Sequence, residues 1–289
     1  MPDNLPDDDA GWRGLPGHRV LALTGRDALA FAQAQFMGDV AALADGQWQW
    51  NGWLTPKGRV VALFAVLRLD AGTLWLLLPD ADPEALAAQL RRFVFRSKVT
   101  AEARPGLAVS GAFRAPAAAA GNAFAGTAET GFELDMSGDT ARVLRIGPAG
   151  DTVANAGFAD RWKLADLRHG LPRLDATQSG EWTPQMLSLQ RLNAFSVKKG
   201  CYPGQEIVAR THFLGQSKRG LALLESDLPL TTGRDVVAAG RAIGKVVGIA
   251  SAGDRHLALA VLPLARDDTP LQVDGATARE LPLLDGLAR

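Results

Sequence analysis

Lys-Gly-Cys-Tyr-Pro-Gly-Gln-Glu-Ile-Val-Ala-Arg, residues 199–210, is the stretch that says most about the fold and function of this chain. It holds the only cysteine, Cys201, and the only tyrosine, Tyr202. If Pro203 opens a short helix, Cys201 lies just before its N-terminus, where the helix dipole and the two preceding lysines favour a thiolate. The alternative is a small buried side chain, which is the usual state of a lone cysteine. The surrounding glycines and charges favour an exposed, activated thiol in a ligand-lined loop.

The composition is that of an ordinary globular protein long enough for two domains. The 289 residues are 47% apolar and 21% charged, and 31 basic residues balance 31 acidic ones. A net charge of zero gives no general attraction to nucleic acid or to anionic membranes, so tight nucleic-acid binding is not expected. One cysteine cannot form an internal disulfide, which suits a reducing compartment. Residues 1–10 lack the features of a signal peptide, and the longest apolar run, residues 60–67, is too short to span a bilayer. We therefore expect a cytoplasmic protein.

Hydrophobic patterning predicts an α+β layer in the N-terminal part of the chain. Thr24 is expected to cap a helix that reaches Phe36, and Asp82 precedes a second helix with Pro83 at its first position. Strands are expected over residues 19–23, 48–54, 60–69 and 73–78, with a turn at residues 55–58. The second helix is expected to bury Leu86, Leu90 and Phe93, and one strand face is expected to carry the three indoles of Trp48, Trp50 and Trp53.

The rest of the chain divides into a connection, a further helix and a barrel. Residues 101–160 are expected to connect two subdomains, with strands near residues 107–113 and 141–146 and an exposed stretch at 115–126. Thr183 and Pro184 are expected to open a helix before the signature. After residue 217, short apolar runs alternate with Gly, Asp and Pro turns, which predicts a small antiparallel β-barrel or sandwich over residues 217–289.

Two other patterns favour structural interpretations. The run Gly-Arg-Ala-Ile-Gly-Lys at residues 240–245 resembles a phosphate-binding loop, but it is one residue short and more typical of a turn between barrel strands. His18, His169, His212 and His256 show no metal-ligand spacing and are interpreted as surface or hydrogen-bonding residues. Basic residues near the second helix and the signature could form a positive rim for an anionic ligand or simply stabilise helix ends.

Residues 199–210 resemble the signature of YgfZ-type folate-binding proteins, relatives of the aminomethyltransferase (T protein) of the glycine cleavage system. Weaker matches follow in the family's order over most of the chain: residues 24–28 with Asp39, residues 53–59, residues 92–99, residues 182–185 and residues 218–221. The resemblance implies an aminomethyltransferase-like α+β unit of two related subdomains, placed here at residues 18–212, followed by the C-terminal barrel.

The resemblance also implies that the protein binds tetrahydrofolate and supports the assembly or repair of iron–sulfur proteins, with an indirect effect on tRNA modification. The implied partners are folate and iron–sulfur client or assembly proteins, and no binding to a membrane is expected. Cys201 is the implied functional thiol. The residues expected to bind folate, if the resemblance holds, are Asp39, Trp53, Lys57, Arg168, Lys199, Tyr202, Gln205, Glu206 and Arg210.

Two departures separate the chain from the T protein. Residues 60–63 are entirely apolar where the T protein carries acidic residues that assist chemistry at the folate nitrogen, which argues against a classical enzyme. Arg168 stands where the T protein has a carboxylate that grips the pterin, and an arginine could instead meet the glutamate tail of the folate. A folate-dependent aminomethyltransferase and a tRNA-binding or tRNA-modifying protein are the alternative functions.

Overall fold

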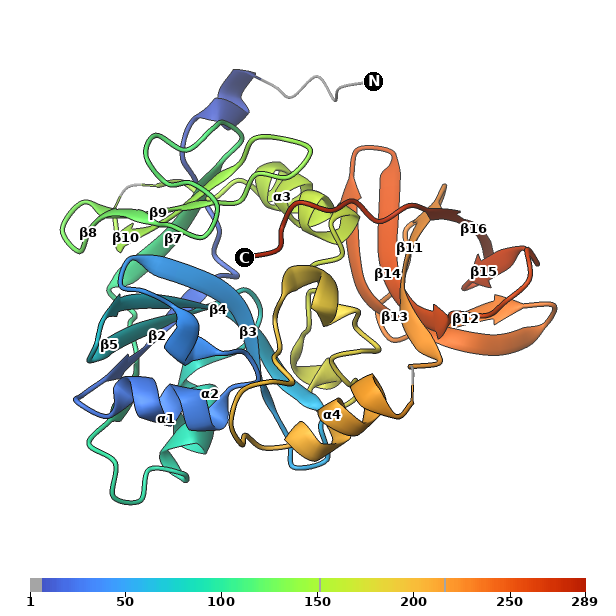
Figure 1. Cartoon of the computed structure of the whole chain (residues 1–289). Helices are drawn as coiled ribbons and strands as arrows, with labels where there is room; N and C mark the ends of the chain where they lie inside the picture. The colour runs from blue at the N-terminus through green and yellow to red at the C-terminus, as the bar shows by residue number, and fades with distance from the viewer. Residues whose placement is uncertain (1–6, 151, 216) are drawn as a thin grey trace.

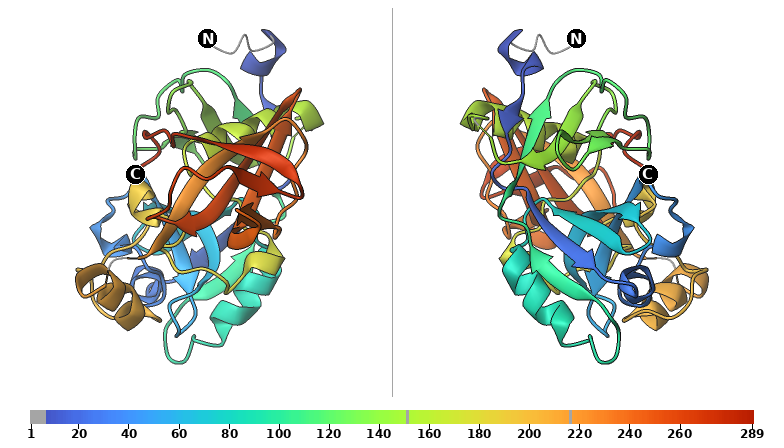
Figure 2. Two further views of the ribbon diagram at one scale, coloured as in Figure 1. Left: turned by 90° about the vertical axis from the view of Figure 1, so that its right-hand side faces the viewer. Right: turned by 90° about the vertical axis from the view of Figure 1, so that its left-hand side faces the viewer.

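The computed structural model describes residues 7–150, 152–215 and 217–289 and contains two five-stranded sheets and a closed barrel. The barrel lies on one side of the molecule and the first sheet with its helices on the other, as Figures 1 and 2 show. The acidic start of the chain falls mostly outside the described residues. Among the described residues, no helix combines the length and apolar character needed to cross a bilayer.

The first sheet has the antiparallel strand order β3-β4-β5-β2-β6. Its apolar residues alternate between two faces, as the pleat of a strand requires. One face is covered by the two helices that follow β2 and β5, and the other packs into a core shared with the second sheet and the barrel. The elements are β2 (Arg19–Thr24), α1 (Ala28–Gln35), η2 (Val40–Ala42), β3 (Gln47–Leu54), β4 (Val60–Asp70), β5 (Thr73–Leu78), α2 (Pro83–Arg91) and β6 (Thr100–Ala103).

The second sheet has the order β1-β7-β10-β9-β8 and is built largely from the stretch expected to be a connection. The two expected strands are β7 and β10, whereas β8 and β9 were not foreseen. Helix α3 lies between this sheet and the barrel (Figure 1). The elements are η1 (Asp7–Ala10), β1 (Arg13–Gly14), β7 (Leu107–Ala112), β8 (Ala125–Thr127), β9 (Gly131–Asp135), β10 (Val143–Pro148) and α3 (Ala156–Arg168).

The C-terminal barrel confirms the expected architecture and closes in the order β11-β14-β13-β12-β15-β16. Its long strands are apolar on both sides because one set of side chains fills the barrel and the other packs on the shared core. The phosphate-loop-like run is indeed the turn between β12 and β13 with the start of β13. The elements are β11 (Arg219–Ser226), β12 (Asp235–Ala238), β13 (Arg241–Ala252), β14 (Arg255–Pro263), β15 (Leu271–Val273) and β16 (Ala276–Leu281).

The first helix begins later than the sequence suggested. Thr24 ends β2 instead of capping α1, and Gly25 has φ +130°, a conformation that holds the chain out of the helix. Asp27 stands at the N-cap position without a capping hydrogen bond, because its carboxylate accepts from the backbone N–H of Lys98 at 2.6 Å. In α2, Asp82 caps as expected, but Phe93 lies beyond the helix and is 38% exposed.

The prediction of a helix that begins at Thr183 is wrong. The chain forms successive turns and a single 3-10 turn, η4 (Leu189–Leu192), with η3 (Ala176–Gln178) preceding it. Ser188 and Asn193 have φ of 48° and 56°, and these left-handed residues interrupt a regular helix on both sides of η4. The Ser188 hydroxyl accepts from the backbone N–H of Leu221, so this irregular turn fastens the segment to the barrel.

The three indoles of β3 do not share a face. Trp48 and Trp50 point into the shared core, whereas Trp53 belongs to the core beneath α1 and α2 and meets the ring of Phe93 at 5.6 Å. Residues an odd number of positions apart point to opposite sides of a strand, and this parity separates Trp53 from the other two. We call Trp48 and Trp50 together the indole face.

A buried charge network joins the two sheets. Asp166 of α3 bonds Arg142 at 2.8 Å, and its other oxygen lies 3.4 Å from Arg173. Arg173 also pairs with Asp80, which follows β5, at 2.8 Å. Buried charges need such pairing because an isolated buried charge is costly. The network fixes how the first sheet, α3 and the second sheet meet.

Candidate functional site

The ammonium group of Lys199 anchors the signature segment, residues 199–210, to the end of α1. Its Nζ donates to three backbone carbonyls, those of Gln33 at 2.5 Å, Phe36 at 2.6 Å and Gly38 at 3.0 Å. Carbonyls at the end of a helix have no partner within the helix. The three donors of one ammonium match these three acceptors, so Lys199 closes α1 and fixes the segment in the same interaction.

Burial lowers the pKa of Lys199 to about 8, and the nearby carboxylate of Asp39 opposes this shift. Asp39 itself accepts a hydrogen bond from the side-chain amide of Gln33 at 2.9 Å. The turn after α1 is held from the other side by Asn51, which is fully buried in β3 and accepts from the N–H of Gly38 at 2.8 Å. Lys199 therefore docks onto a turn that is already fixed to the first sheet.

Two further side chains of the signature segment point inward. The Tyr202 hydroxyl donates to the carbonyl of Ser196 at 3.1 Å, and its ring lies 5.0 Å from the Lys199 nitrogen. Burial raises the pKa of Tyr202 to about 12, so its hydroxyl stays protonated. The Gln205 amide donates to the carbonyl of Lys199 at 3.0 Å. These contacts give the loop before α4 (Gln205–Phe213) one defined conformation.

Two glycines bring the signature segment against the turn between β3 and β4. Gly58 and Gly204 both have positive φ, 68° and 78°. A Cβ on Gly204 would lie 2.6 Å from the Cα of Gly58 and from the carbonyl oxygen of Thr55. Backbone packing this close tolerates no side chain. Gly204 is also the residue before α4, so Pro203 stands outside the helix that it was expected to open.

Cys201 is exposed, as expected for a functional thiol. Lys199 turns away from it toward the carbonyls, whereas Lys198, three residues before the cysteine, is exposed. Glu206 and Arg210 are exposed on α4, and Lys57 is exposed on the adjacent turn. The structure thus gathers most of the predicted site residues around one loop that presents a sulfur to solvent. These residues are Asp39, Lys57, Lys199, Cys201, Tyr202, Gln205, Glu206 and Arg210.

Of the two remaining predicted site residues, Arg168 lies apart from this group and Trp53 adjoins it through its backbone. Arg168 ends α3 and pairs with Asp139 at 2.7 Å, beside the C-terminal segment. Trp53 packs under the α1 side of the first sheet against Phe93. The backbone of Trp53 pairs with that of Phe36, whose carbonyl accepts the hydrogen bond from Lys199.

The histidines do not form a metal site. No group of three or more His, Cys, Asp or Glu side chains in the described part of the chain could hold a metal ion. His169 bonds Asp139 at 2.8 Å and the Asp285 carbonyl at 2.9 Å, and His256 bonds Ser251 at 2.9 Å. His212 is exposed on α4. His18 departs from the expectation because it is mostly buried and its ring forms no hydrogen bond to a described residue.

The C-terminal segment, residues 282–289, lies on the indole face, a contact that the sequence did not predict. The Trp50 indole N–H donates to the Leu287 carbonyl at 2.8 Å, and the Arg289 guanidinium lies 5.5 Å from the Trp48 ring. Arg289 also donates to the Asp135 carbonyl of the second sheet at 2.8 Å. Figure 1 shows this end of the chain between the two sheets and the barrel. A contact between residues 237 positions apart has no local sequence signal.

The indole face has features that suit a flat heterocycle. Trp48 and Trp50 meet edge to face at 5.4 Å, and the buried Trp48 indole N–H has no hydrogen-bond partner among the described residues. A buried donor without a partner is uncommon and is open to a ligand acceptor. A flat heterocycle with ring acceptors, such as a pterin, would suit this donor and these rings once the C-terminal segment moves aside.

No family model matches the chain, but individual proteins do. The aminomethyltransferase T of the glycine cleavage system from Bartonella henselae superimposes with a TM-score of 0.75 over 94% of this chain and 84% of its own, at 15% identity. The chain therefore has the aminomethyltransferase-like fold with a C-terminal barrel.

Sequence relatives narrow this class. The tRNA-modifying protein YgfZ of Escherichia coli O157:H7 is 32% identical over 71% of this chain and 68% of its own length. Its namesake from Klebsiella pneumoniae is 30% identical over 70% and 67%. The one from Colwellia psychrerythraea is 28% identical over 72% and 69%. The chain belongs to the YgfZ family, which confirms the resemblance seen in residues 199–210.

Gly204→Ala is expected to lower the free energy of unfolding by about 2–4 kcal/mol. The added methyl group strains the left-handed backbone conformation and overlaps with Gly58. Denaturant titration measures this loss. Gly200→Ala is the matched control in the same loop, because Gly200 is exposed, has no atom near its Cβ position and no positive φ. We expect the control to change stability by about 0.5 kcal/mol or less. Equal effects of the two variants would refute the close packing.

Lys199→Met is expected to destabilise the protein by about 2–4 kcal/mol at pH 7, because three backbone carbonyls, two of them in buried hydrogen bonds, lose a charged donor. Between pH 8 and about 10.5 the unfolded state keeps the Lys199 proton that the folded state releases. The stability of the parent protein relative to Lys199→Met should therefore rise with pH across this window. Denaturation at several pH values tests the sign, and a difference that is flat or falls with pH would contradict the lowered pKa.

Proposed function

We propose that this protein is a tetrahydrofolate-binding accessory factor that supports the assembly or repair of iron–sulfur proteins through the Cys201 thiol. The observation that carries the proposal is the arrangement around Cys201. Lys199, Tyr202 and Gln205 all point inward and fix the loop, whereas the sulfur is exposed. Membership of the YgfZ family and the aminomethyltransferase-like fold support the same function.

An exposed thiol can bind iron or attack sulfur of a client protein for a short time. A single cysteine cannot hold an iron–sulfur cluster, which generally takes about four thiolates. An exposed sulfur on a rigid loop can contribute one ligand or nucleophile while a client protein supplies the others. In this proposal, an effect on tRNA modification follows indirectly from the iron–sulfur enzymes that are served.

The folate site of the proposal is the indole face. The pterin ring packs against Trp48 and Trp50, and the indole N–H of Trp48 donates to a ring acceptor. Leu287 and Arg289 lie on the same indoles, so binding exchanges their contacts for contacts to the ligand. The folate supplies the flat ligand, while the protein's own residues orient it and exclude water. Strand β4 offers no carboxylate at residues 60–63, which favours an accessory role over aminomethyl transfer.

Trp48→Phe is expected to weaken tetrahydrofolate binding about fivefold to tenfold, because it removes the unpaired N–H and part of the ring surface. Calorimetric titration with tetrahydrofolate measures the affinity, and tryptophan fluorescence reports whether the indoles respond. Trp12→Phe is the control, since Trp12 lies at the second sheet beneath Arg114. If the parent protein gives no heat, or both variants bind like the parent, the folate assignment fails.

Cys201→Ser is expected to keep the fold and the tetrahydrofolate affinity but to lose complementation of a strain lacking its own YgfZ protein. The readout is the activity of an iron–sulfur enzyme in extracts, and the variant should fall to the level of the empty vector. Gly200→Ala, which alters the neighbouring exposed position, should complement. Full complementation by Cys201→Ser would remove the thiol from the mechanism and leave the folate site to be judged separately.

A further inference from the structure

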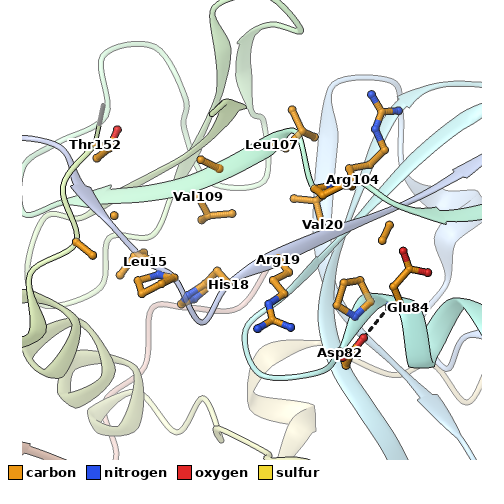
Figure 3. A pocket seen from close by; sticks show the side chains of 17 residues that line it. Leu15, His18, Arg19, Val20, Asp82, Glu84, Arg104, Leu107, Val109 and Thr152 are labelled. Atoms are coloured by element: carbon orange, nitrogen blue, oxygen red, sulfur yellow. Dashed lines mark hydrogen bonds between the residues drawn. The ribbon is translucent and has the colours of Figure 1, made fainter. Parts of the chain in front are cut away.

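A cleft of about 510 Å³ lies between β2 of the first sheet and β7 of the second sheet, next to the start of α2 (Figure 3). None of the residues that line it belongs to the signature segment or the indole face. Its volume lies within the range of about 300–1,000 Å³ that holds small organic ligands. This cleft is separate from the site proposed for folate.

The floor of the cleft is apolar. Leu15, Val20 and Val109 line it and are at most 5% exposed, and Leu107 lies beside them. Figure 3 shows Val20 on β2, Val109 on β7 and Leu15 on the segment that follows β1. A surface of this kind stabilises a ligand with a flat hydrocarbon body, because burying it removes apolar area from water.

His18 gives the cleft a polar group without a partner. It lines the cleft, is only 9% exposed, and its ring makes no hydrogen bond to any described residue. Burial lowers its pKa well below the ordinary value, and the charges of Arg173 and Arg142 add to this effect. The imidazole is therefore neutral and presents one donor and one acceptor nitrogen. The ring nitrogens are not sealed from solvent, so a ligand group in the cleft can take the place of water as their hydrogen-bond partner.

The charges at the edge of the cleft favour an anion near Arg19. Arg19 lies between His18 and Asp82 in Figure 3 and forms no ion pair with a described residue. The carboxylate of Asp82 is already engaged by the N–H groups of Glu84 at 2.8 Å and Ala85 at 3.1 Å. The N-terminus of α2 adds positive potential on the same side. Glu84 is the exposed carboxylate nearby and limits the preference to a ligand of low charge.

We propose that this cleft binds a small aromatic carboxylate, with its rings against the apolar lining, its carboxylate at Arg19 and a hydroxyl or amino group on the His18 ring. The hydrogen-bonding group and the carboxylate stand at opposite ends of the flat body. This site is independent of the function proposed for Cys201 and the indole face.

The test uses 6-hydroxy-2-naphthoate as the probe and protein labelled with ¹⁵N and ¹³C in its histidines. The probe is expected to shift the ring signals of His18 in a saturable way and to leave those of His169, His212 and His256 unchanged. Arg19→Gln should weaken binding about tenfold, the effect of losing one charge-assisted hydrogen bond. Arg241→Gln, which removes an exposed charge on the barrel, should bind like the parent.

Ligand variants separate the two ends of the site. 2-Naphthol, which lacks the carboxylate, should bind at least tenfold more weakly than the probe, and its residual affinity should not respond to Arg19→Gln. No saturable shift of His18 at millimolar probe, or equal affinities of the parent and Arg19→Gln, would overturn the proposal. Shifts of all four histidines alike would also overturn it, because they indicate non-specific binding.

Discussion

A single ammonium group determines how the signature segment sits on the rest of the molecule. Lys199 satisfies three backbone carbonyls at the end of α1, and those carbonyls belong to a turn that Asn51 already fixes to β3. An arginine would present a flat fork and a methionine no donor, so the three converging carbonyls select a lysine. The conformation of the loop, and with it the position of Cys201, depends on this interaction.

Some residues of the loop fix its conformation, and Cys201 is exposed to solvent. Lys199, Tyr202 and Gln205 face inward, and Gly204 permits backbone contact with Gly58. The sulfur of Cys201 is what the loop presents to solvent between these fixed points. The indole face lies on the other side of the first sheet from α1 and carries the C-terminal segment. The two parts of the proposed function are therefore at different places: the thiol is exposed in the loop, whereas Trp48 and Trp50 lie in the shared core, to which Tyr202 of the loop also belongs.

Much of the fold could be predicted because its signals are local. Short apolar runs identified β2, β4, β5 and the strands of the barrel, and Asp82-Pro83 identified the start of α2. The errors arose where the backbone or distant contacts overrode local preference. Gly25 delays α1, Ser188 interrupts the helix expected from Thr183, and strand parity separates Trp53 from the indole face. The partners of Lys199 and Trp50 lie 161 or more positions away in the chain, so periodicity could not reveal them.

The central claim is that a fixed signature segment and an indole face together define a folate-binding protein with a reachable thiol. A crystal structure of the complex with tetrahydrofolate tests it most directly. The account predicts the pterin against Trp48 and Trp50, a hydrogen bond from the Trp48 N–H, displaced side chains of Leu287 and Arg289, and an unchanged loop around Lys199. Folate bound elsewhere, with the C-terminal segment still on both indoles, would contradict it.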